Sequence, residues 1–500
     1  MRETDVRLEM IDSILKTPHG NFTSLPELHK KCMTADLLFY LKLAMYYQEV
    51  GKVRDHNKVF AAAIATSGAY EFRKLGGYLM FGLNPKDFLT TAKMAMSDFG
   101  GSTGGKRRGL RKYSEIFVRD MEKQADIGRG ANRFLENSKF LRKLFTIFRI
   151  APSLRTAVSL HLYKAGNKPD ATAYLPFLAI KKLSKTEDEQ TICEIIDANK
   201  LPPLTTLGAL KIKLTPAIAA SLVKGMSPKQ LQNFTGMLQK KGLLEDPDFK
   251  KAVTAKLKKG GKNLSMRGTV AAKKLGKDAD IMKDATDSFV KSLPMIRGKK
   301  ILLCIDKSKS MEKAIILGKD AASTLASKVE NPEENLLILA FGATAGIVPL
   351  PVKKTFSEFE ITFRYMTADG STSIGVCIEK ALEMGFTPDT VVFITDGREN
   401  TPPFFETVLS NSDLKLTRFV TCLVGDIIED VKISNTLIKS RGFEVENVDF
   451  SKGDYYSLPN VIELISKGGV RELIKHIDSI DLFGKLAEYR DRFSKRGITL

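Results

Sequence analysis

The chain has 500 residues, of which 43% are hydrophobic and 27% charged, and this balance excludes an intrinsically disordered protein. Its length exceeds what one hydrophobic core usually supports, so we expect at least two domains. The formal net charge of +20 is uneven, because residues 1–300 carry 54 Lys and Arg against 29 Asp and Glu, whereas residues 301–500 carry 24 against 29. A basic excess in one region indicates either a polyanion partner or a solvated face that keeps the protein soluble.

The start of the chain, MRETDVRLEMIDSILK, is charged and has helical periodicity, so no signal peptide is expected. The longest uncharged stretch, residues 335–352, is short for a membrane span and is interrupted by glycines and prolines, so we expect two buried strands there and no transmembrane segment. The absence of a CxxC pair predicts reduced, buried thiols and a cytoplasmic location. The scattered cysteines are Cys32, Cys193, Cys304, Cys377 and Cys422.

Helical periodicity extends from residue 1 to about residue 297, which predicts an all-α first half. Gly, Pro or Asn separates segments of helix length. Short linkers imply antiparallel neighbours, and pairs of helices stacked in series would form a solenoid-like array. The clearest segments are residues 34–50, 56–81, 110–125 and 139–152.

Two groups of cations stand out within this half. Residues 101–150 hold 13 basic against 5 acidic residues. The first group lies at a predicted helix start, where positive charge opposes the helix macrodipole, so something other than helix stability favours it. The second group alternates with phenylalanines, whose helical spacing indicates that they pack in the core. The cations, and not the aromatic rings, are therefore the expected contacts with a polyanion. The first group is Lys106, Arg107, Arg108, Arg111 and Lys112, and the second includes Arg129, Arg133, Lys139, Arg142 and Lys143.

After residue 298 the pattern changes to apolar strands that alternate with helical stretches. This alternation predicts βαβ units and a mainly parallel, doubly wound sheet. Ligands of such sheets lie at the carboxyl ends of the strands, where Asp306 and Asp396 fall. The predicted strands are residues 300–306, 335–341, 390–396, 418–425 and 443–450.

Oxygen-bearing side chains follow these strands in a pattern that suits a metal. Asp306, Ser308 and Ser310 alternate in CIDKSKSM, Thr372 lies in the loop TADGSTSIG, and Asp396 ends the strand of FITDGREN. Three loops at one sheet edge could converge on a hard divalent cation such as Mg²⁺, which prefers oxygen ligands. Such an ion would keep a position open for an acidic ligand. The alternative is that these side chains only cap a turn and a helix start.

Catalytic alternatives have less support. Phosphoryl-transferring hydrolases also begin with an aspartate after an apolar strand, but the second aspartate that they need is replaced here by Ser308. The histidines show no metal-ligand spacing, and each is expected at the surface or at a helix end. They are His19, His29, His56, His161 and His476. We therefore expect a protein that is not an enzyme.

The metal motif and the helical half each resemble a known family. The DxSxS sequence, the threonine loop and the strand-end aspartate resemble, in order, a von Willebrand factor A domain with its metal-ion-dependent adhesion site. An all-helical half joined to such a domain resembles the Ro autoantigen, or TROVE-module, RNA-binding proteins. Three stretches carry the second resemblance: GGKRRGLRKYSEIFV, DLLFYLKLAMYYQEV and RGKKILLCIDKSKSM.

The resemblance implies an architecture and a function. Residues 1–297 would form a ring of HEAT-like helical repeats, residues 298–481 the A domain, and residues 482–500 a C-terminal tail or helix. The ring would bind small noncoding or misfolded RNA and single-stranded RNA ends through the two cation groups, and the A-domain metal would bind an acidic protein ligand. The alternative is a protein-assembly or adhesion module that uses the metal and docks its basic half on an acidic surface.

Overall fold

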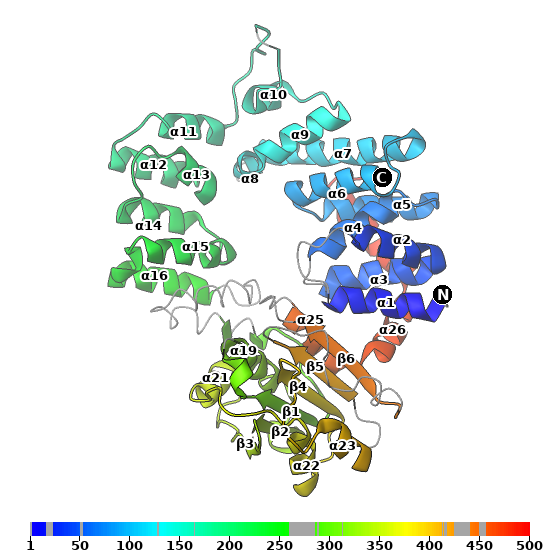
Figure 1. Ribbon diagram of the computed structural model, residues 1–500. Helices are drawn as coiled ribbons and strands as arrows, with labels where there is room; N and C mark the ends of the chain where they lie inside the picture. The colour runs from blue at the N-terminus through cyan, green and yellow to red at the C-terminus, as the bar shows by residue number, and fades with distance from the viewer. Residues whose placement is uncertain are drawn as a thin grey trace. The chain divides into compact units, whose positions relative to one another are not determined.

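The computed structural model divides into two compact units (Figure 1). The first unit comprises residues 1–6, 20–256 and 477–500, and the second comprises residues 7–19 and 257–476. Helices α1 (Glu3–Lys16) and α26 (Val470–Asp478) contribute residues to both units. The domain boundaries predicted at residues 297 and 481 stay predictions. The structure describes residues 3–16, 24–50, 54–127, 130–164, 166–259, 286–287, 290–312, 314–412, 414, 418–424, 441–449 and 457–500.

The first unit is helical, as predicted, and proline or a polar cap begins many of its helices. Ser227 illustrates this, because its hydroxyl accepts the N–H of Gln230 while the Gln230 side chain accepts the N–H of Ser227, and Pro228 follows the cap. The helices are α2 (Leu25–Ala35), α3 (Leu37–Val50), α4 (Arg54–Ala65), α5 (Tyr70–Phe81), α6 (Pro85–Ser97), α7 (Gly104–Ala125), α8 (Gly130–Glu136), α9 (Ser138–Phe148), α10 (Leu154–Leu160), α11 (Leu175–Leu183), α12 (Glu189–Asn199), α13 (Pro203–Ala209), α14 (Pro216–Gly225), α15 (Pro228–Lys240), the 3₁₀ turn η1 (Leu243–Glu245), α16 (Pro247–Lys258) and α27 (Leu482–Ser494).

One predicted helical segment is divided by local side-chain chemistry. Residues 56–81 form α4 and α5, and the break falls where the Thr66 hydroxyl donates to the Ala62 carbonyl and Gly68 follows. The two helices then pack closely, because a Cβ at Gly76 would lie 2.2 Å from the backbone nitrogen of Ala65. Only glycine allows these two backbones to approach so closely.

Many helices of the first unit pack on helices close to them in the sequence, as short linkers predict. α4 packs on α2, α3, α5 and α6, and α7 packs on α8 and α9. Beyond the connection through α10, α12 packs on α11 and α14, and α15 packs on η1. α8 also contacts α11 and α13, so the two series of helices join there. This serial packing agrees with the predicted array of helical repeats, whereas its closure into a ring stays a prediction.

The second unit is built on a sheet with the strand order β3-β2-β1-β4-β5-β6. All neighbouring pairs are parallel except β2 and β3. The strands are β1 (Ile301–Asp306), β2 (Leu336–Phe341), β3 (Ala345–Ile347), β4 (Thr390–Thr395), β5 (Arg418–Leu423) and β6 (Glu444–Asp449). The predicted doubly wound sheet and its five main strands are confirmed.

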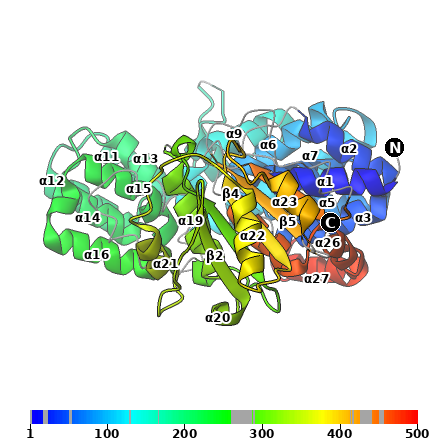
Figure 2. The same cartoon turned by 60° about the horizontal axis from the view of Figure 1, so that its bottom comes forward.

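Helices cover both faces of this sheet (Figure 2). Alternate residues of the strands, such as Cys304 and Phe393, pack in one core with α22 (Gly375–Glu383) and α23 (Phe405–Asn411). On the other face α19 (Ile315–Ala326) packs on β1, β4 and α21 (Phe356–Phe363). Further helical elements in the described part of the unit are η3 (Lys309–Met311), α20 (Pro332–Asn335) and α25 (Ser457–Lys467). Burial on both faces explains why β1, β2 and β4 are continuous apolar runs.

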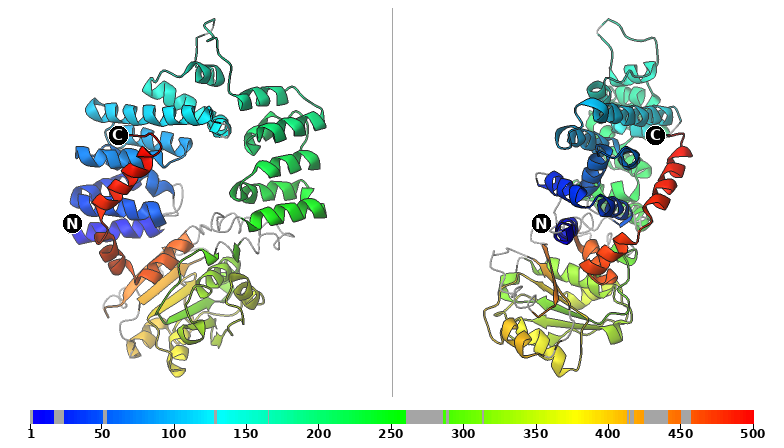
Figure 3. Two further views of the ribbon diagram at one scale, coloured as in Figure 1. Left: turned by 180° about the vertical axis from the view of Figure 1, so that it is seen from behind. Right: turned by 90° about the vertical axis from the view of Figure 1, so that its right-hand side faces the viewer.

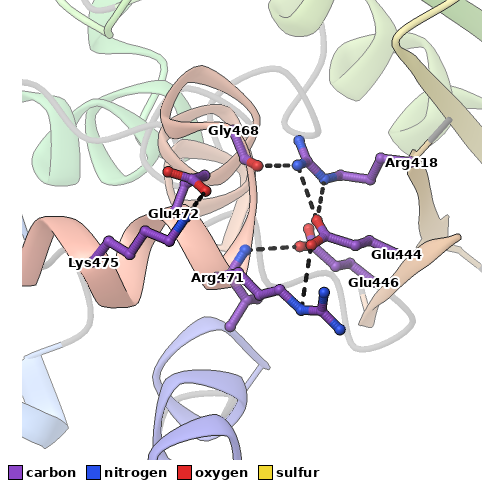
Figure 4. A network of polar contacts seen from close by, with 8 residues as sticks. Arg418, Glu444, Glu446, Gly468, Arg471, Glu472 and Lys475 are labelled. Carbon is purple, nitrogen blue, oxygen red and sulfur yellow. Dashed lines mark hydrogen bonds and ion pairs between the residues drawn. The ribbon is translucent and has the colours of Figure 1, made fainter. Parts of the chain in front are cut away.

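A polar network joins the start of β5 and β6 to the turn between α25 and α26 (Figure 4). The Arg418 guanidinium contacts the Glu444 carboxylate at 3.0 Å and donates to the Gly468 carbonyl. Arg471 also pairs with Glu444, with 3.7 Å between its Nε and Oε1. The backbone N–H of Val470 donates to Glu446. This network fixes the turn between the two helices at the sheet edge.

Two sequence expectations are wrong. Only the first part of residues 335–352 is a buried strand, because β3 lies at the sheet edge, where Ile347 is 53% exposed. His29 is fully buried within α2, whereas we expected a surface or helix-end position; His56 lies in the first turn of α4, a helix-end position, but is also fully buried. The His29 Nδ1 lies 2.8 Å from the Tyr40 hydroxyl and its Nε2 lies 3.1 Å from the His56 Nδ1. Polar partners on neighbouring helices make this burial possible.

Candidate functional sites

The first candidate site is the loop that follows β1. The backbone N–H of Ser308 donates to the Asp306 Oδ1 at 2.8 Å, and the Ser308 and Ser310 hydroxyl oxygens are 3.0 Å apart. Asp306 and Ser308 are buried, whereas Ser310 is exposed. One turn thus brings three side-chain oxygens together.

Thr372 and Asp396 come from two further loops at the same edge. β1 and β4 are parallel neighbours, and the Thr395 hydroxyl at the end of β4 donates to the Asp306 Oδ2 at 2.6 Å. The N–H of Thr372 donates to the Asn400 side chain at 2.8 Å, which ties the threonine loop to the loop after β4. The N–H of Lys309 donates to the Gly370 carbonyl at 3.1 Å. The three loops therefore hydrogen-bond to one another, while the role of their side chains as metal ligands stays a prediction.

The electrostatics of this loop cluster disfavour an ionised Asp306 in the metal-free chain. Burial, with a smaller contribution from the charge of Asp396, raises the pKa of Asp306 to about 6, against the opposing effect of its hydrogen bonds from Ser308 and Thr395. Asp396 is also buried, and its carboxylate accepts the backbone N–H of Arg398 at 3.0 Å. A bound cation would favour the ionised form of Asp306.

This donor set fits a hard divalent cation. In the described ranges no three His, Cys, Asp or Glu side chains are grouped to hold a metal, so hydroxyls would complete the ligands of Asp306 and Asp396. The two lysines that alternate with Asp306, Ser308 and Ser310 do not replace the cation, because neither Lys307 nor Lys309 forms an ion pair with a described carboxylate. The cationic side chain that does approach the site is Arg398, whose Nε lies 3.7 Å from the Asp396 Oδ2. Two carboxylates with hydroxyls hold a hard cation loosely, which suits a binding site.

Glu399 positions this site, and sequence reasoning did not identify it. Its carboxylate accepts the N–H groups of Ile374 at 2.6 Å, Gly375 at 3.2 Å and Phe405 at 2.9 Å. Burial raises the pKa of Glu399, although these hydrogen bonds oppose the shift. The residue therefore joins the threonine loop to the start of α23. Its position three residues after Asp396 in FITDGREN was the available signal.

The second candidate site is the start of α7, where the first cation group lies. The helix begins at Gly104, its first turn holds no acidic residue, and the Thr103 side chain does not cap it. Arg107, Arg108, Arg111 and Lys112 are exposed, and Lys106 is half-buried. None of the five forms an ion pair with a carboxylate of the described chain. Positive charge thus accumulates where the helix dipole is also positive.

The second cation group lies on α8 and α9, except for Arg129, which falls outside the described residues. Arg133, Lys139, Arg142 and Lys143 are exposed, and none pairs with a described carboxylate. The phenylalanines between them turn inward, as expected, because Phe134, Phe145 and Phe148 are buried. The cations of α9 therefore occupy its solvent face, and its aromatic rings serve the core.

Comparisons with known proteins identify a shared fold. No protein-family model matches the sequence, and no curated protein sequence matches it. The structure is similar to that of the Deinococcus radiodurans RO (RSR) protein, with a TM-score of 0.58 and 14% identity over 89% of this chain and 94% of that one. A von Willebrand factor type A protein from Catenulispora acidiphila aligns with 34% of this chain and 42% of its own, at 15% identity and a TM-score of 0.28. The predicted resemblance to Ro is confirmed as a resemblance of fold.

Proposed function

From a fold shared with the Ro protein along nearly the whole chain, we propose that this chain is a non-enzymatic, cytoplasmic RNA-binding protein. Its RNA would be small noncoding or misfolded molecules and single-stranded ends. The observation that carries the proposal is the group of cations at the start of α7, which has no carboxylate partner among the described residues and opposes the helix dipole. Phosphates beside this helix start would supply the missing negative charge.

The chemistry of the cations determines what kind of recognition to expect. Guanidinium groups bind phosphate oxygens in pairs, and each contact releases counterions from the nucleic acid. Contacts to phosphates position RNA but do not distinguish its bases. The cations of α8 and α9 would extend the same type of contact, because α7 packs on both helices. Affinity would therefore depend strongly on salt and weakly on sequence.

The second unit would add a metal-dependent function to the protein. Asp306, Ser308, Ser310, Thr372 and Asp396 would hold Mg²⁺ or a similar divalent cation, which when bound supplies an electrophilic position for a carboxylate. The chain's own part is to bring these oxygens to one sheet edge and to hold the loops in register through hydrogen bonds. The expected partner is an acidic group on another protein.

A direct binding experiment tests the RNA proposal. The whole protein, freed of copurifying RNA by nuclease and high salt, is titrated with a single-stranded RNA of about 20 nucleotides at several salt concentrations. We expect binding at low salt that weakens steeply as salt increases. Absence of binding at low salt would contradict the proposal and favour the assembly or adhesion module. Metal-dependent turnover of a phosphoester, lost in Asp306→Ala, would contradict the non-enzymatic assignment.

A further inference from the structure

A second positively charged feature of the first unit is a pocket beneath the C-terminal helix. α27 lies along the helices of the first unit, where it contacts α3 and α5 (Figure 3, red helix near the C label). The Phe493 ring stacks on Tyr78 with 5.4 Å between the ring centroids, and Arg496 pairs with Asp120 at 2.6 Å. Near the end of the chain, Leu500 packs against Gly77. These contacts hold α27 in a defined place.

The contact of α27 with the helix array leaves a cavity of about 300 Å³. Its volume lies at the lower end of the range for small-molecule sites and is too small for a duplex or a folded peptide. Residues of α3, α5, α7, α8 and α27 line it. The lining includes the cations Arg133, Arg492 and Arg496, the acid Asp120, the amide of Gln48 and the ring of Tyr489.

The charges in this lining do not balance. Asp120 is already shared, since its Oδ2 accepts from Arg496 at 2.6 Å and from the Gln124 amide at 2.6 Å. Arg133 and Arg492 form no ion pair with any carboxylate that the structure describes. Two guanidinium groups from different helices therefore line one cavity without a counter-charge of their own. That arrangement favours an anion that accepts from both, and a phosphate group suits the planar donors of arginine.

The remaining lining is suited to a flat, polar ring. Tyr489 is half-buried, so part of its ring is accessible to a ligand, and every nucleobase offers a face that can stack on an aromatic ring. The Gln48 amide nitrogen donates to the Asn57 side chain at 3.0 Å, which leaves its carbonyl oxygen as an acceptor for an amino group. Phosphate, ring and amino group are the parts of a nucleotide.

We propose that this pocket binds one nucleotide unit, with the phosphate at Arg133 and Arg492 and the base beside Tyr489. The unit is either a free mononucleotide or the phosphorylated end of an RNA. The site is separate from the cation group at the start of α7, and it does not require RNA to bind there. Of the residues predicted to contact RNA, Arg133 is the one that lines the pocket.

Calorimetry on the whole protein tests the proposal with the four 5′-nucleoside monophosphates and with inorganic phosphate as separate probes. We expect at least one mononucleotide to bind with submillimolar affinity, at least tenfold tighter than inorganic phosphate. The double variant Arg133→Gln/Arg492→Gln should weaken binding at least tenfold, and Tyr489→Leu should weaken the mononucleotide while leaving phosphate unchanged. Arg490→Gln, on the same helix but outside the lining, is the matched control and should bind as wild type does.

The outcomes separate this proposal from its alternatives. No mononucleotide binding at millimolar concentration, or equal binding by the double variant with an unchanged melting temperature, would overturn it. Phosphate that binds as tightly as the mononucleotides would also overturn it, because the pocket would then be a simple anion site. Competition by a 5′-phosphorylated but not a 5′-hydroxyl oligonucleotide identifies an RNA end as the source, and absence of competition identifies a free nucleotide. Arg107→Gln/Arg108→Gln/Arg111→Gln should keep mononucleotide binding even if it loses RNA.

Discussion

The start of α7 and the carboxyl edge of the sheet both gather like charges, but they do so in opposite surroundings. At α7 the cations are mostly exposed and have no partner of opposite charge in the described chain. At the sheet edge Asp306 is buried and accepts hydrogen bonds from Ser308 and Thr395. Exposed charges respond to ionic strength, whereas buried ionisable groups respond to pH and to a small bound ion. The two sites should therefore respond to different perturbations.

The largest expected effect comes from removing charge at α7. Replacing Arg107, Arg108 and Arg111 together by Gln should weaken RNA binding by on the order of a hundredfold at low salt, because three phosphate contacts are lost. The slope of log K against log[salt] should fall by about one unit for each contact. Filter binding at several salt concentrations measures both quantities. The fold should persist, since all three side chains are exposed.

A triple variant that binds RNA as wild type does at every salt concentration would mean that the group only keeps the protein soluble. Lys241→Gln/Arg490→Gln/Lys495→Gln, which removes three exposed cations that lie outside α7–α9 and outside the lining of the pocket beneath α27, serves as the matched control for net charge. It should reduce RNA affinity much less, because these side chains lie outside the proposed RNA surface.

At the sheet edge, removing charge should stabilise the metal-free protein. Asp306 has a pKa of about 6 in the folded chain, above its ordinary value of 3.8, so ionising it at pH 7 costs folding free energy. Asp306→Asn should therefore raise the stability of the second unit by about 2–3 kcal/mol at pH 7, less the cost of weaker hydrogen bonding to Thr395. Urea unfolding in EDTA, followed by circular dichroism, measures the difference.

The stability difference between wild type and Asp306→Asn should depend on pH and on Mg²⁺. The destabilisation by Asp306 is absent below about pH 4, develops between about pH 4 and 6 and is constant above that, so wild type and Asp306→Asn should converge in acid. Millimolar Mg²⁺ should raise the melting temperature of wild type but not of the variant. Equal stabilisation of both proteins by Mg²⁺ would show that these side chains are only caps.

A smaller effect should appear in the pH dependence of metal binding. Because Mg²⁺ needs an ionised Asp306 whose pKa is about 6, its affinity should be about tenfold lower at pH 5 than at pH 7. RNA binding at α7 should change little over the same range, since guanidinium groups remain charged. Calorimetry with Mg²⁺ and with RNA at the two pH values compares the two dependences. An equal loss of RNA affinity at pH 5 would contradict the expected difference between the two sites.

The smallest expected effect concerns Ser310, the exposed member of the metal loop. Ser310→Ala should weaken Mg²⁺ binding by only about two- to threefold, because a water molecule can replace an exposed hydroxyl among the ligands. Ser308→Ala should cost more, since Ser308 is buried beside Asp306. Calorimetric titration of the two variants, side by side, ranks the two hydroxyls, and a reversed order would place the ion on the outer side of the loop.

Sequence patterns predicted the strands and the loops of the sheet edge because both depend on neighbours in the chain. The apolar run that ends at Asp306 is a buried strand whatever packs on it. Asp306 therefore lies at the carboxyl end of that strand. Other features depend on partners distant in the chain. The packing of α27 on α5 could not be predicted, because periodicity identifies the apolar face of a helix but not what covers it.

The same limit applies to the histidines and to the edge strand. His29 and His56 are 27 positions apart and lie on different helices, so nothing in the sequence joined them. β3 has three residues, which is too short for an alternating pattern to appear. Glu399 could have been suspected from its place after Asp396, but its three backbone partners become neighbours only when the loops fold together.

The close approach of α4 and α5 at Gly76 has a consequence for amide hydrogen exchange. Residues 59–64 of α4 are all fully buried, and the backbone of α5 covers their helix closely. Their amide protons should exchange only when the first unit unfolds as a whole, whereas amides around the exposed Val352, after β3, should exchange through local opening. The exchange rates of α4 would therefore report the unfolding free energy of the first unit inside the intact chain, without a fluorescent label and independently of metal at the sheet edge.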